Sequence, residues 1–509
     1  MTICRCLLIC LLVSSVHADD VNVRDCGAVG DGQTLCTESI QQAIDRCADT
    51  SGGTVTVPFG TFLTNTIFLK SNVNLHLAKG AVLLGSTDSR AFRRAVVYAD
   101  GIENAAITGL GTIDGQGFKT HYPTSGPRHN NICLFKSRNI RVQDVTLTNA
   151  PSWVFRIQQC DGVMVRGVRI YSFANENNDG IDIDGKNVTI SDCLIDCDDD
   201  AMCLKSDEPE FLVENVAISN CVIASNCNAI KFGTASHCGF RNVSISNCTI
   251  RRPSESVHRP WSQKIQGVTR DDTVISGVAL EVVDGGFMDQ VTISNLSMTG
   301  IQTPLFIRLG SRKGRGTLQN VVISGIAATN ESLITSSITG IPGSYVENVT
   351  IRDILFRYKG TGTLAEANAP VPEKETAYPE NRMFGYSLPA YGLYVRHVKN
   401  LVCEDFRFTL QAPDARPAVL LEDCHNLRLS GFDVAPPAEG QPLVRCIEST
   451  NVTLSGYQSA TPAAKFLVVE GESSAHIKLA GNDFRGIQTV VELEDGAEPS
   501  AVQEMQNFQ

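Results

Sequence analysis

The sequence has few aromatic residues, no excess of positive charge and no long apolar run. Aromatic side chains make up 6% of the 509 residues, and 43 basic residues face 55 acidic ones, which gives a net charge of −12. An acidic chain argues against nucleic acid as a partner. No run of 18 apolar residues is present, so the sequence predicts no membrane-spanning helix. Low-complexity tracts are also absent, and the composition indicates a globular protein.

The first residues have the pattern of a secretory signal. Arg5 precedes a short apolar stretch at residues 7–13, and a small-x-small pattern ends at Ala18. We therefore predict a signal peptide over residues 1–18 and a secreted or periplasmic protein.

The cysteines do not indicate a metal site or a disulfide framework. Of 18 cysteines, three lie in residues 1–18, which leaves 15, an odd number. Cys193, Cys221 and Cys248 occupy the same place in successive copies of a short motif. This placement favours a stack of buried thiols over disulfides. Paired Cys-x-x-Cys spacing is missing, so no zinc site is predicted.

That motif is a short alternating strand that usually begins with Asn. Copies include NIRVQDVTL at residue 139, NVTISDCLI at 187, NVAISNCVI at 215 and NVSISNCTI at 242, and the series continues to residue 451. Most copies start 23 to 30 residues after the previous one, and two gaps of 48 and 52 are close to double. Each copy exposes an apolar face that only a neighbouring copy can cover. The frame of leucine-rich repeats is absent, so we predict an all-β fold, a parallel β-helix.

Three boundaries follow from this repeat. Residues 37–49 place Ile40, Ala43, Ile44 and Cys47 on one helical face, which predicts a helix that caps the N-terminal end. Residues 19–485 form one β-helix catalytic domain in this interpretation. The Pro-rich stretch after residue 360 is then a long loop between turns that can wall a cleft, and residues 486–509 are a polar tail.

One stretch concentrates acidic residues. Residues 177–206 contain eight aspartates. Asp179 precedes Asp199 and Asp200 by 20 and 21 residues, about one turn, so the three should lie on neighbouring rungs. Neighbouring carboxylates can divide into acid and base roles, but a calcium site or a solvated polar corner would have the same composition.

The same residues carry a resemblance to a known family. The segments NNDG at 177 and DDAMCLKS at 199 resemble motifs of the pectin-degrading glycoside hydrolases of family 28, the polygalacturonases and their relatives. The opening stretch from Asp25 and the segment NAPSWVF at 149 are also similar to that family. The resemblance implies a right-handed parallel β-helix and hydrolysis with inversion, without a metal or other cofactor.

The resemblance also implies roles for individual residues. Asp199 matches the general acid, and Asp179 and Asp200 match the carboxylates that hold and activate water. Asp182 matches a supporting aspartate of the cleft, and Trp153 lies in the Pro-x-Trp segment beside it.

Two departures from the family pattern concern the substrate. Asn228 stands where polygalacturonases have His, and the Arg-Ile-Lys motif that grips a galacturonate is absent, with Arg308 as the nearest candidate. Lys231 can supply the missing positive charge or cap a turn. His237 can line the cleft or hydrogen-bond in a turn.

We thus predict a monomeric, exported hydrolase whose partner is an acidic, pectin-type polysaccharide. Three alternatives stay open: another uronate-containing or rhamnogalacturonan-type substrate, a calcium-dependent polysaccharide lyase, and a solenoid that binds glycan without cleaving it.

Overall fold

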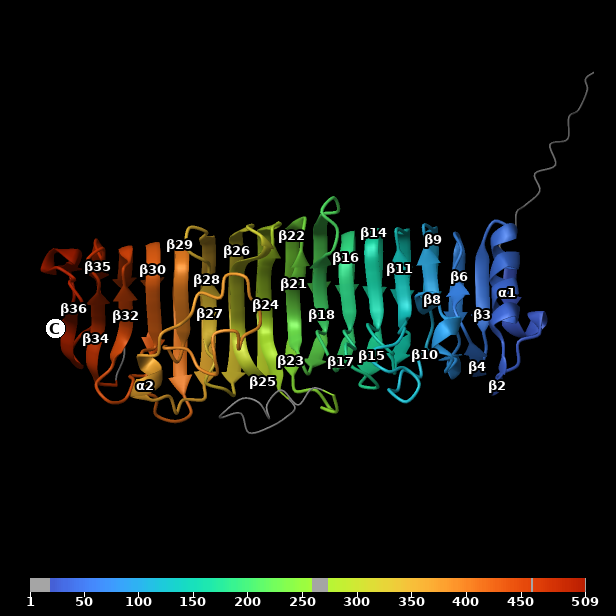
Figure 1. Ribbon diagram of the computed structural model, residues 1–509, viewed down its shortest axis with the longest axis horizontal. Helices are drawn as coiled ribbons and strands as arrows, with labels where there is room; N and C mark the ends of the chain where they lie inside the picture. The colour runs from blue at the N-terminus through green and yellow to red at the C-terminus, as the bar shows by residue number, and fades with distance from the viewer. Residues whose placement is uncertain (1–18, 259–272, 459–460, 509) are drawn as a thin grey trace, which may run out of the picture.

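A computed structural model describes residues 19–258, 273–458 and 461–508. The signal peptide predicted for residues 1–18 lies outside these ranges. The strands of each turn pair in parallel with those of the turns before and after, as predicted for a parallel β-helix. Figure 1 shows the resulting elongated stack, with the two ends of the chain at opposite ends of the molecule. Among the described residues, no helix is long and apolar enough to span a bilayer.

The first of three parallel sheets contains the alternating motif found in the sequence. We call it sheet A, and it follows the whole length of the solenoid. Its strands are β1 (Asp19–Asn22), β3 (Gly53–Val57), β6 (Val73–Leu77), β9 (Glu103–Thr108), β12 (Arg138–Gln143), β14 (Phe155–Arg166), β16 (Ile181–Ser191), β19 (Val213–Ser219), β22 (Gly239–Ser246), β25 (Phe287–Gly314), β26 (Thr317–Asn330), β28 (Val346–Tyr358), β29 (Leu393–Leu410), β30 (Val419–Ser430), β33 (Thr450–Ser455), β35 (Ile477–Ala480) and β37 (Val502–Met505).

Sheet B is made of shorter strands that follow those of sheet A along the chain. Parts of β25, β26, β28 and β29 also belong to it. Its other strands are β2 (Asp31–Leu35), β4 (Gly60–Thr64), β7 (Ala81–Gly85), β10 (Thr112–Asp114), β13 (Thr146–Thr148), β15 (Arg169–Ser172), β17 (Leu194–Cys197), β20 (Val222–Ser225), β23 (Thr249–Arg251) and β31 (Asp433–Val434).

Sheet C bears the residues of the candidate site. It takes in the first halves of β14, β16, β29 and β30 and the later part of β25. Its other strands are β5 (Ile67–Phe68), β8 (Ala95–Asp100), β11 (Asn130–Phe135), β18 (Met202–Ser206), β21 (Asn228–Ser236), β24 (Val274–Asp284), β27 (Ser336–Thr339), β32 (Pro442–Ile447), β34 (Ala463–Glu470) and β36 (Ile487–Glu494).

The asparagines that begin the sheet A motif adopt left-handed backbone conformations. Asn187, Asn215 and Asn242 have φ of 53°, 57° and 54°. Asn tolerates this region better than other residues with a Cβ atom, which explains why it recurs at this turn. Each side chain also bonds to the previous rung, since Asn215 Nδ2 donates to Asn187 Oδ1 (3.0 Å) and Asn242 Nδ2 donates to Asn215 Oδ1 (2.7 Å). We call this series the asparagine ladder, and it resumes from Asn320 to Asn451.

The cysteines behave as small buried residues. Cys193, Cys221 and Cys248 lie in the core, and each thiol donates to the carbonyl oxygen two residues earlier at 3.2–3.3 Å. All 15 cysteines of the described chain are free thiols. The predicted stack of thiols is therefore confirmed.

Few helices interrupt the solenoid. The predicted N-terminal helix is α1 (Thr37–Asp49), which buries Ile40, Ala43, Ile44 and Cys47 and lies at the end of the stack in Figure 1. The others in the described part of the chain are short: α2 (Leu364–Ala367) and the 3-10 turns η1 (Val23–Cys26), η2 (Ser89–Ala91) and η4 (Pro499–Ala501).

The prediction of a polar tail over residues 486–509 is wrong. β36 pairs with β34, and β37 pairs with β35, so the solenoid continues almost to the end of the chain. The apolar residues of β36 are only half buried, since within residues 461–508 it pairs with β34 alone. This end of the stack therefore has a more polar composition, and its strand pattern is weak in the sequence.

The asparagine ladder generates a test of its contribution to stability. Asn215→Ala removes two inter-rung hydrogen bonds and leaves a residue with a Cβ in a left-handed conformation. We expect the free energy of unfolding, measured in urea, to fall by about 2–3 kcal/mol. Asn215→Gly loses the same bonds without the backbone cost, so its loss should be about 1 kcal/mol smaller. Equal losses in the two variants would contradict a backbone contribution.

Candidate active site

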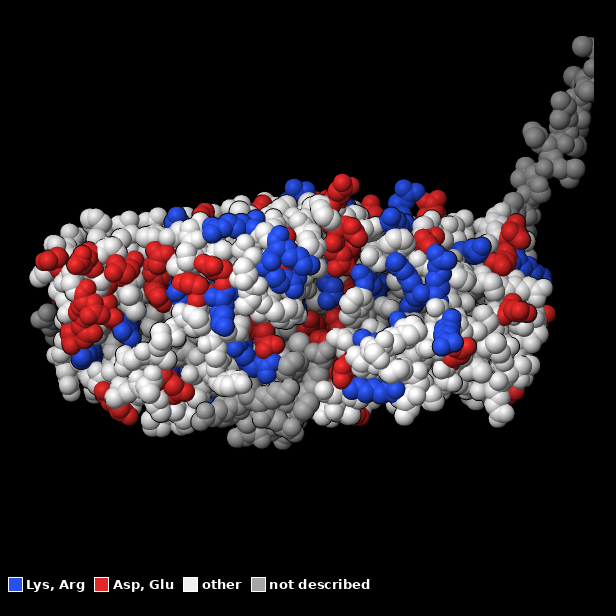
Figure 2. All heavy atoms as spheres, in the orientation of Figure 1, with Lys and Arg blue, Asp and Glu red and all other residues white. Residues whose placement is uncertain are grey.

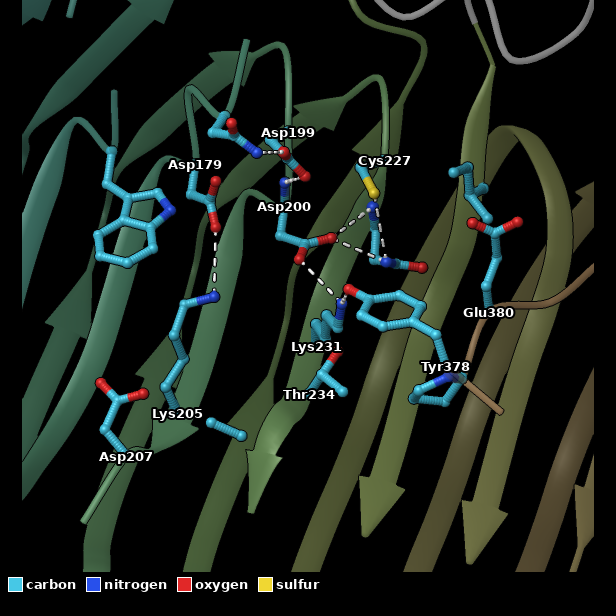
Figure 3. A pocket seen from close by; sticks show the side chains of 16 residues that line it. Asp179, Asp199, Asp200, Lys205, Asp207, Cys227, Lys231, Thr234, Tyr378 and Glu380 are labelled. Atoms are coloured by element: carbon cyan, nitrogen blue, oxygen red, sulfur yellow. Dashed lines mark hydrogen bonds and ion pairs between the residues drawn. The ribbon is translucent and has the colours of Figure 1, made fainter. Parts of the chain in front are cut away.

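A cavity of about 440 Å³ opens where the strands of sheet C begin near the middle of the solenoid. Figure 3 shows its carboxylates and lysines converging from consecutive rungs. Of the predicted site residues it contains Trp153, Asp179, Asp199, Asp200, Asn228 and Lys231. The lining residues without a prediction include Asn177, Lys205, Asp207, Cys227, Tyr378 and Glu380.

The register of the strands brings the aspartates together. Ile181 pairs with Met202, and Met202 pairs with Ile230, so Asp179, Asp200 and Asn228 stand at one level on three rungs. Backbone bonds continue this register, because Gly180 N donates to Asp200 O (2.9 Å) and Ala201 N donates to Asn228 O (2.9 Å). The predicted proximity of Asp179 to Asp199 and Asp200 is confirmed.

Asp199 and Asp200 share the cavity because they lie in a bend. β17 ends at Cys197 and β18 begins at Met202, so neither residue follows the alternation of a strand. Asp199 accepts a hydrogen bond from Asn177 Nδ2 (3.3 Å) and another from the backbone N–H of Asp200 (2.9 Å). Two adjacent carboxylates can therefore face the same cavity.

Asp200 lies in an environment that favours its charged form. Its carboxylate is 3.1 Å from Lys231 Nζ and accepts hydrogen bonds from Asn228 Nδ2 (2.8 Å) and Asn228 N (3.1 Å). Burial opposes ionisation, but the charges of Lys231 and Lys205 and the bond from Asn228 outweigh it. The pKa of Asp200 is consequently lowered, so this carboxyl is ionised.

The opposite holds for Asp179. Burial raises its pKa well above the ordinary value, and the charges of Asp199 and Asp182 raise it further. Lys205 opposes this shift from 3.3 Å and also pairs with Asp182 at 3.4 Å. Burial raises the pKa of Asp182 itself to about 6. The cavity thus combines an ionised carboxylate with a neighbour that holds its proton, as acid–base chemistry requires.

Two lysines occupy the positions that a metal would need. One group of possible ligands is Asp179, Asp182 and Cys203, and another is Asp199, Asp200 and Cys227. Lys205 sits between the aspartates of the first group, and Lys231 neutralises Asp200 in the second. Calcium takes about 6–8 oxygen ligands. Ammonium groups beside the carboxylates, and a thiol in each group, do not fit that requirement.

A long loop forms the wall on the C-terminal side of the cavity. Residues 359–392 connect β28 with β29 and bring Tyr378, Pro379 and Glu380 to the cavity. Lys231 Nζ lies 3.5 Å from the Tyr378 hydroxyl and 5.6 Å from the centre of its ring. The loop predicted as a cleft wall therefore contributes an aromatic side chain.

The prediction that Arg308 binds substrate is wrong. Its side chain is 1% exposed and lies outside the cavity. The guanidinium donates to Gly340 O (2.8 Å), Glu373 O (2.9 Å) and Lys374 O (3.1 Å). Arg308 thus fixes the loop that contains Tyr378 and acts on the cavity only through it.

Asp182 and His237 also lie outside the cavity lining. Asp182 is buried behind Lys205, which agrees with a supporting role. His237 Nε2 is 3.9 Å from Asp284, a carboxylate already paired with Arg312. Of the two alternatives for His237, the structure favours the turn over the cleft.

The sequence contains a signal for one of the lining residues without a prediction, Lys205, but none for another, Tyr378. Lys205 belongs to the segment DDAMCLKS, which begins with the two aspartates and continues as β18 on the rung next to that of Asp179. This position could have indicated a role in the site. Tyr378 gives no such signal, because only the fold of a non-repetitive loop brings it to Lys231.

Glu281 provides a test of the charge balance behind the cavity. It is buried 3.9 Å from Lys231, and burial raises its pKa from an ordinary 4.5 to about 7. A carboxyl with a raised pKa stabilises the fold while protonated, and this contribution is lost as the pH rises from about 4.5 towards 7. When the pH is raised from 5 to 8, the melting temperature of Glu281→Gln should therefore fall by about 2–4 °C less than that of the wild type.

The exposed Glu210 offers a matched control for that measurement. Glu210→Gln should keep the pH dependence of the wild type. If Glu281→Gln also kept it, the raised pKa of Glu281 would be contradicted.

Comparison with known proteins agrees with this geometry. The family model of the glycosyl hydrolases family 28 matches residues 47–375. A probable polygalacturonase of Vitis vinifera is 26% identical over 390 residues, which cover 66% of this chain and 75% of the relative. A probable rhamnogalacturonase E of Aspergillus oryzae is 24% identical over 228 residues, 44% of this chain and 52% of the relative.

Among solved structures, a hyperthermoactive exopolygalacturonase of Thermotoga maritima is similar with a TM-score of 0.60. The likeness covers 77% of this chain and 92% of that one at 21% identity, and it shows a shared fold. The match of the family model extends over most of the chain and includes every aspartate of the cavity. The protein is a glycoside hydrolase that belongs to the glycosyl hydrolases family 28.

Proposed function

We propose that the protein hydrolyses α-glycosidic bonds of galacturonate units in pectin-type polysaccharide, with inversion at the anomeric carbon. The observation that carries this proposal is the convergence of Asp179, Asp199 and Asp200 from consecutive rungs on one cavity, with Asp200 held ionised beside Lys231. Similarity to a probable polygalacturonase supports galacturonan as the substrate class.

In the proposed mechanism Asp199 is the proton donor. Its carboxyl gives a proton to the glycosidic oxygen while the bond to the anomeric carbon breaks. Asp200, held ionised by Lys231 and Asn228, accepts a proton from the water that attacks the opposite face of the sugar. Asp179 lies beside that water and holds it by hydrogen bonding. One water is consumed: its hydroxyl group bonds to the anomeric carbon of one product, and the glycosidic oxygen of the other product gains a proton.

The cavity cations have a second role in this proposal. Lys205 is paired with Asp179, and Lys231 is paired with Asp200. Because each carboxylate offsets part of the ammonium charge, the lysines attract an anionic sugar less tightly than unpaired lysines would. Asn228, at the position of the family histidine, donates to Asp200 and keeps this carboxylate oriented. Trp153 lines the other side of the cavity, where its ring packs against Arg156 (4.3 Å) and Lys205 (5.5 Å) and helps to hold both cations in place.

A second candidate substrate is the rhamnogalacturonan backbone. The similarity to a probable rhamnogalacturonase favours it, as does the missing Arg-Ile-Lys motif. The same three aspartates would catalyse that reaction.

We further propose that the solenoid is right-handed and that α1 closes its N-terminal end. The buried face of α1 contacts β1, β3 and β6, which supports this role because uncapped strands invite edge pairing. Export after cleavage at Ala18 and action as a monomer complete the proposal. An extracellular location would give the enzyme access to a polymeric substrate.

The activity itself can be measured by the release of reducing ends. We expect release from polygalacturonate or from rhamnogalacturonan, in the presence of EDTA, and the preferred polymer identifies the substrate. Asp199→Asn should lower kcat by about 10²–10⁴-fold because the proton donor is lost. Asp353→Asn, an exposed aspartate on β28, is the matched control and should keep the wild-type rate. Loss of activity with EDTA would favour the lyase, and release from neither polymer would contradict the proposal.

The roles of the aspartates can be separated with an activated substrate. An aryl galacturonide with a good leaving group needs little protonation as its bond breaks. Asp199→Asn should therefore lose at least about tenfold less activity on this substrate than on polygalacturonate, whereas Asp200→Asn should lose similar activity on both. Equal losses for Asp199→Asn on the two substrates would assign the proton donor to another residue.

A further inference from the structure

A second cavity on sheet C gathers arginines in an otherwise acidic protein. Its volume is about 300 Å³, and its lining includes Arg93, Arg94, Arg128 and Arg156. Figure 2 shows basic side chains over this part of the solenoid, beside the acidic side chains at its middle. The net charge of the whole chain is −12, so four guanidinium groups around one cavity are a strong local exception. We call this cavity the arginine groove.

The arginine groove adjoins the catalytic cavity. The Arg156 guanidinium lies 4.3 Å from the ring centre of Trp153, which lines that cavity. On the other side, Arg128 donates to Asn177 Oδ1 (3.1 Å), and Asn177 in turn donates to Asp199 (3.3 Å). The two cavities therefore share a wall made of these contacts.

The groove also follows the direction in which the rungs stack. β8, β11, β14 and β16 are consecutive in sheet C, and Arg156 pairs in register with Asp182. The groove consequently begins on β14, one rung before Asp179 and two rungs before Asp199 and Asp200, and extends two rungs further to β8, at about 4.8 Å for each rung. A polymer chain that runs along the sheet from the catalytic cavity would pass over it.

The four arginines differ in whether the partner of the guanidinium is a carboxylate or a neutral group. Arg156 forms an ion pair with Asp207 (2.7 Å), and Arg128 donates to the carbonyl oxygen of Glu176 (2.8 Å). Arg94 donates to the neutral Gln158 (3.0 Å), and its guanidinium lies 4.6 Å from the ring centre of Phe135, which holds it in place.

Arg93 and Arg94 are therefore the charges that a ligand can reach. Both are exposed, and within the described part of the chain neither forms an ion pair with a carboxylate. A guanidinium has five N–H donors in a planar fork, which matches the two oxygens of a carboxylate.

We propose that the arginine groove is a subsite for the carboxylate of a uronate unit that lies about three to four rungs before the bond to be cleaved. Arg93 and Arg94 bind the carboxylate, and Arg128 and Arg156 connect the groove with the catalytic cavity. This inference rests on the proposed function, because an acidic polysaccharide supplies a carboxylate at every uronate. The groove thereby replaces part of the carboxylate recognition that the missing Arg-Ile-Lys motif would provide.

The test uses oligogalacturonates of two to six units and the double variant Arg93→Gln/Arg94→Gln. We expect kcat/KM on the hexamer to fall by about tenfold, mostly through KM, and to fall less on the dimer, which is too short to reach the groove. Salt should weaken hexamer cleavage more in the wild type than in the double variant. Arg352→Gln, an exposed arginine on β28, is the matched control and should behave as the wild type.

Binding of the hexamer to Asp199→Asn, measured by calorimetry with and without the two arginine substitutions, separates this inference from the proposed function. Weaker binding after substitution upholds the subsite, even if the wild type cleaves no galacturonan and the proposed function fails. Unchanged binding, or an equal loss of kcat/KM on dimer and hexamer, overturns the subsite while leaving hydrolysis intact. Melting temperatures equal to that of the parent protein confirm that the variants are folded.

Discussion

The stacking of parallel rungs about 4.8 Å apart is the constraint on which the rest of the molecule depends. Each turn must repeat the path of the turn before it, so a residue type that suits one corner recurs at that corner. The asparagine ladder is the clearest result, since a left-handed turn and an inter-rung amide bond coincide in one residue. The same spacing forces Asp179, Asp200 and their neighbours into contact. Burial and two lysines then divide these carboxylates into a protonated and an ionised one.

Much of the fold was predictable because the same short sequence motif recurs in nearly every turn. Asn followed by alternating apolar residues predicted the stacked strands, and a spacing of about one turn predicted the meeting of Asp179 with Asp199 and Asp200. The end of the solenoid was not predictable in the same way. Among the described residues β36 has a neighbouring strand on one side only, and its apolar residues are half buried, so the apolar pattern that marks a covered rung is weaker there.

The remaining errors concern parts of the molecule that do not repeat. An expected positive charge near the substrate makes Arg308 a candidate in the sequence, yet its guanidinium is buried and donates to the backbone carbonyls of Gly340 and of Glu373 and Lys374 in the 359–392 loop. Tyr378 reaches the cavity through the same loop. Long-range contacts of a single loop leave no periodic pattern, whereas Lys205 was predictable in principle because it stands on a strand in register with the catalytic rungs.

The asparagine ladder has a consequence for covalent modification. Of the seven asparagines that begin Asn-x-Ser/Thr triplets, six use the side-chain nitrogen as a hydrogen-bond donor in the folded chain: Asn187, Asn242, Asn295, Asn330, Asn348 and Asn451. An N-linked glycan attaches to this nitrogen. In a host that glycosylates secreted proteins, sugar transfer and rung stacking would therefore compete for the same atoms. At Asn242, Asn348 and Asn451, whose nitrogens make steps of the ladder, a glycan added before folding would replace one of the two N–H groups of the donor.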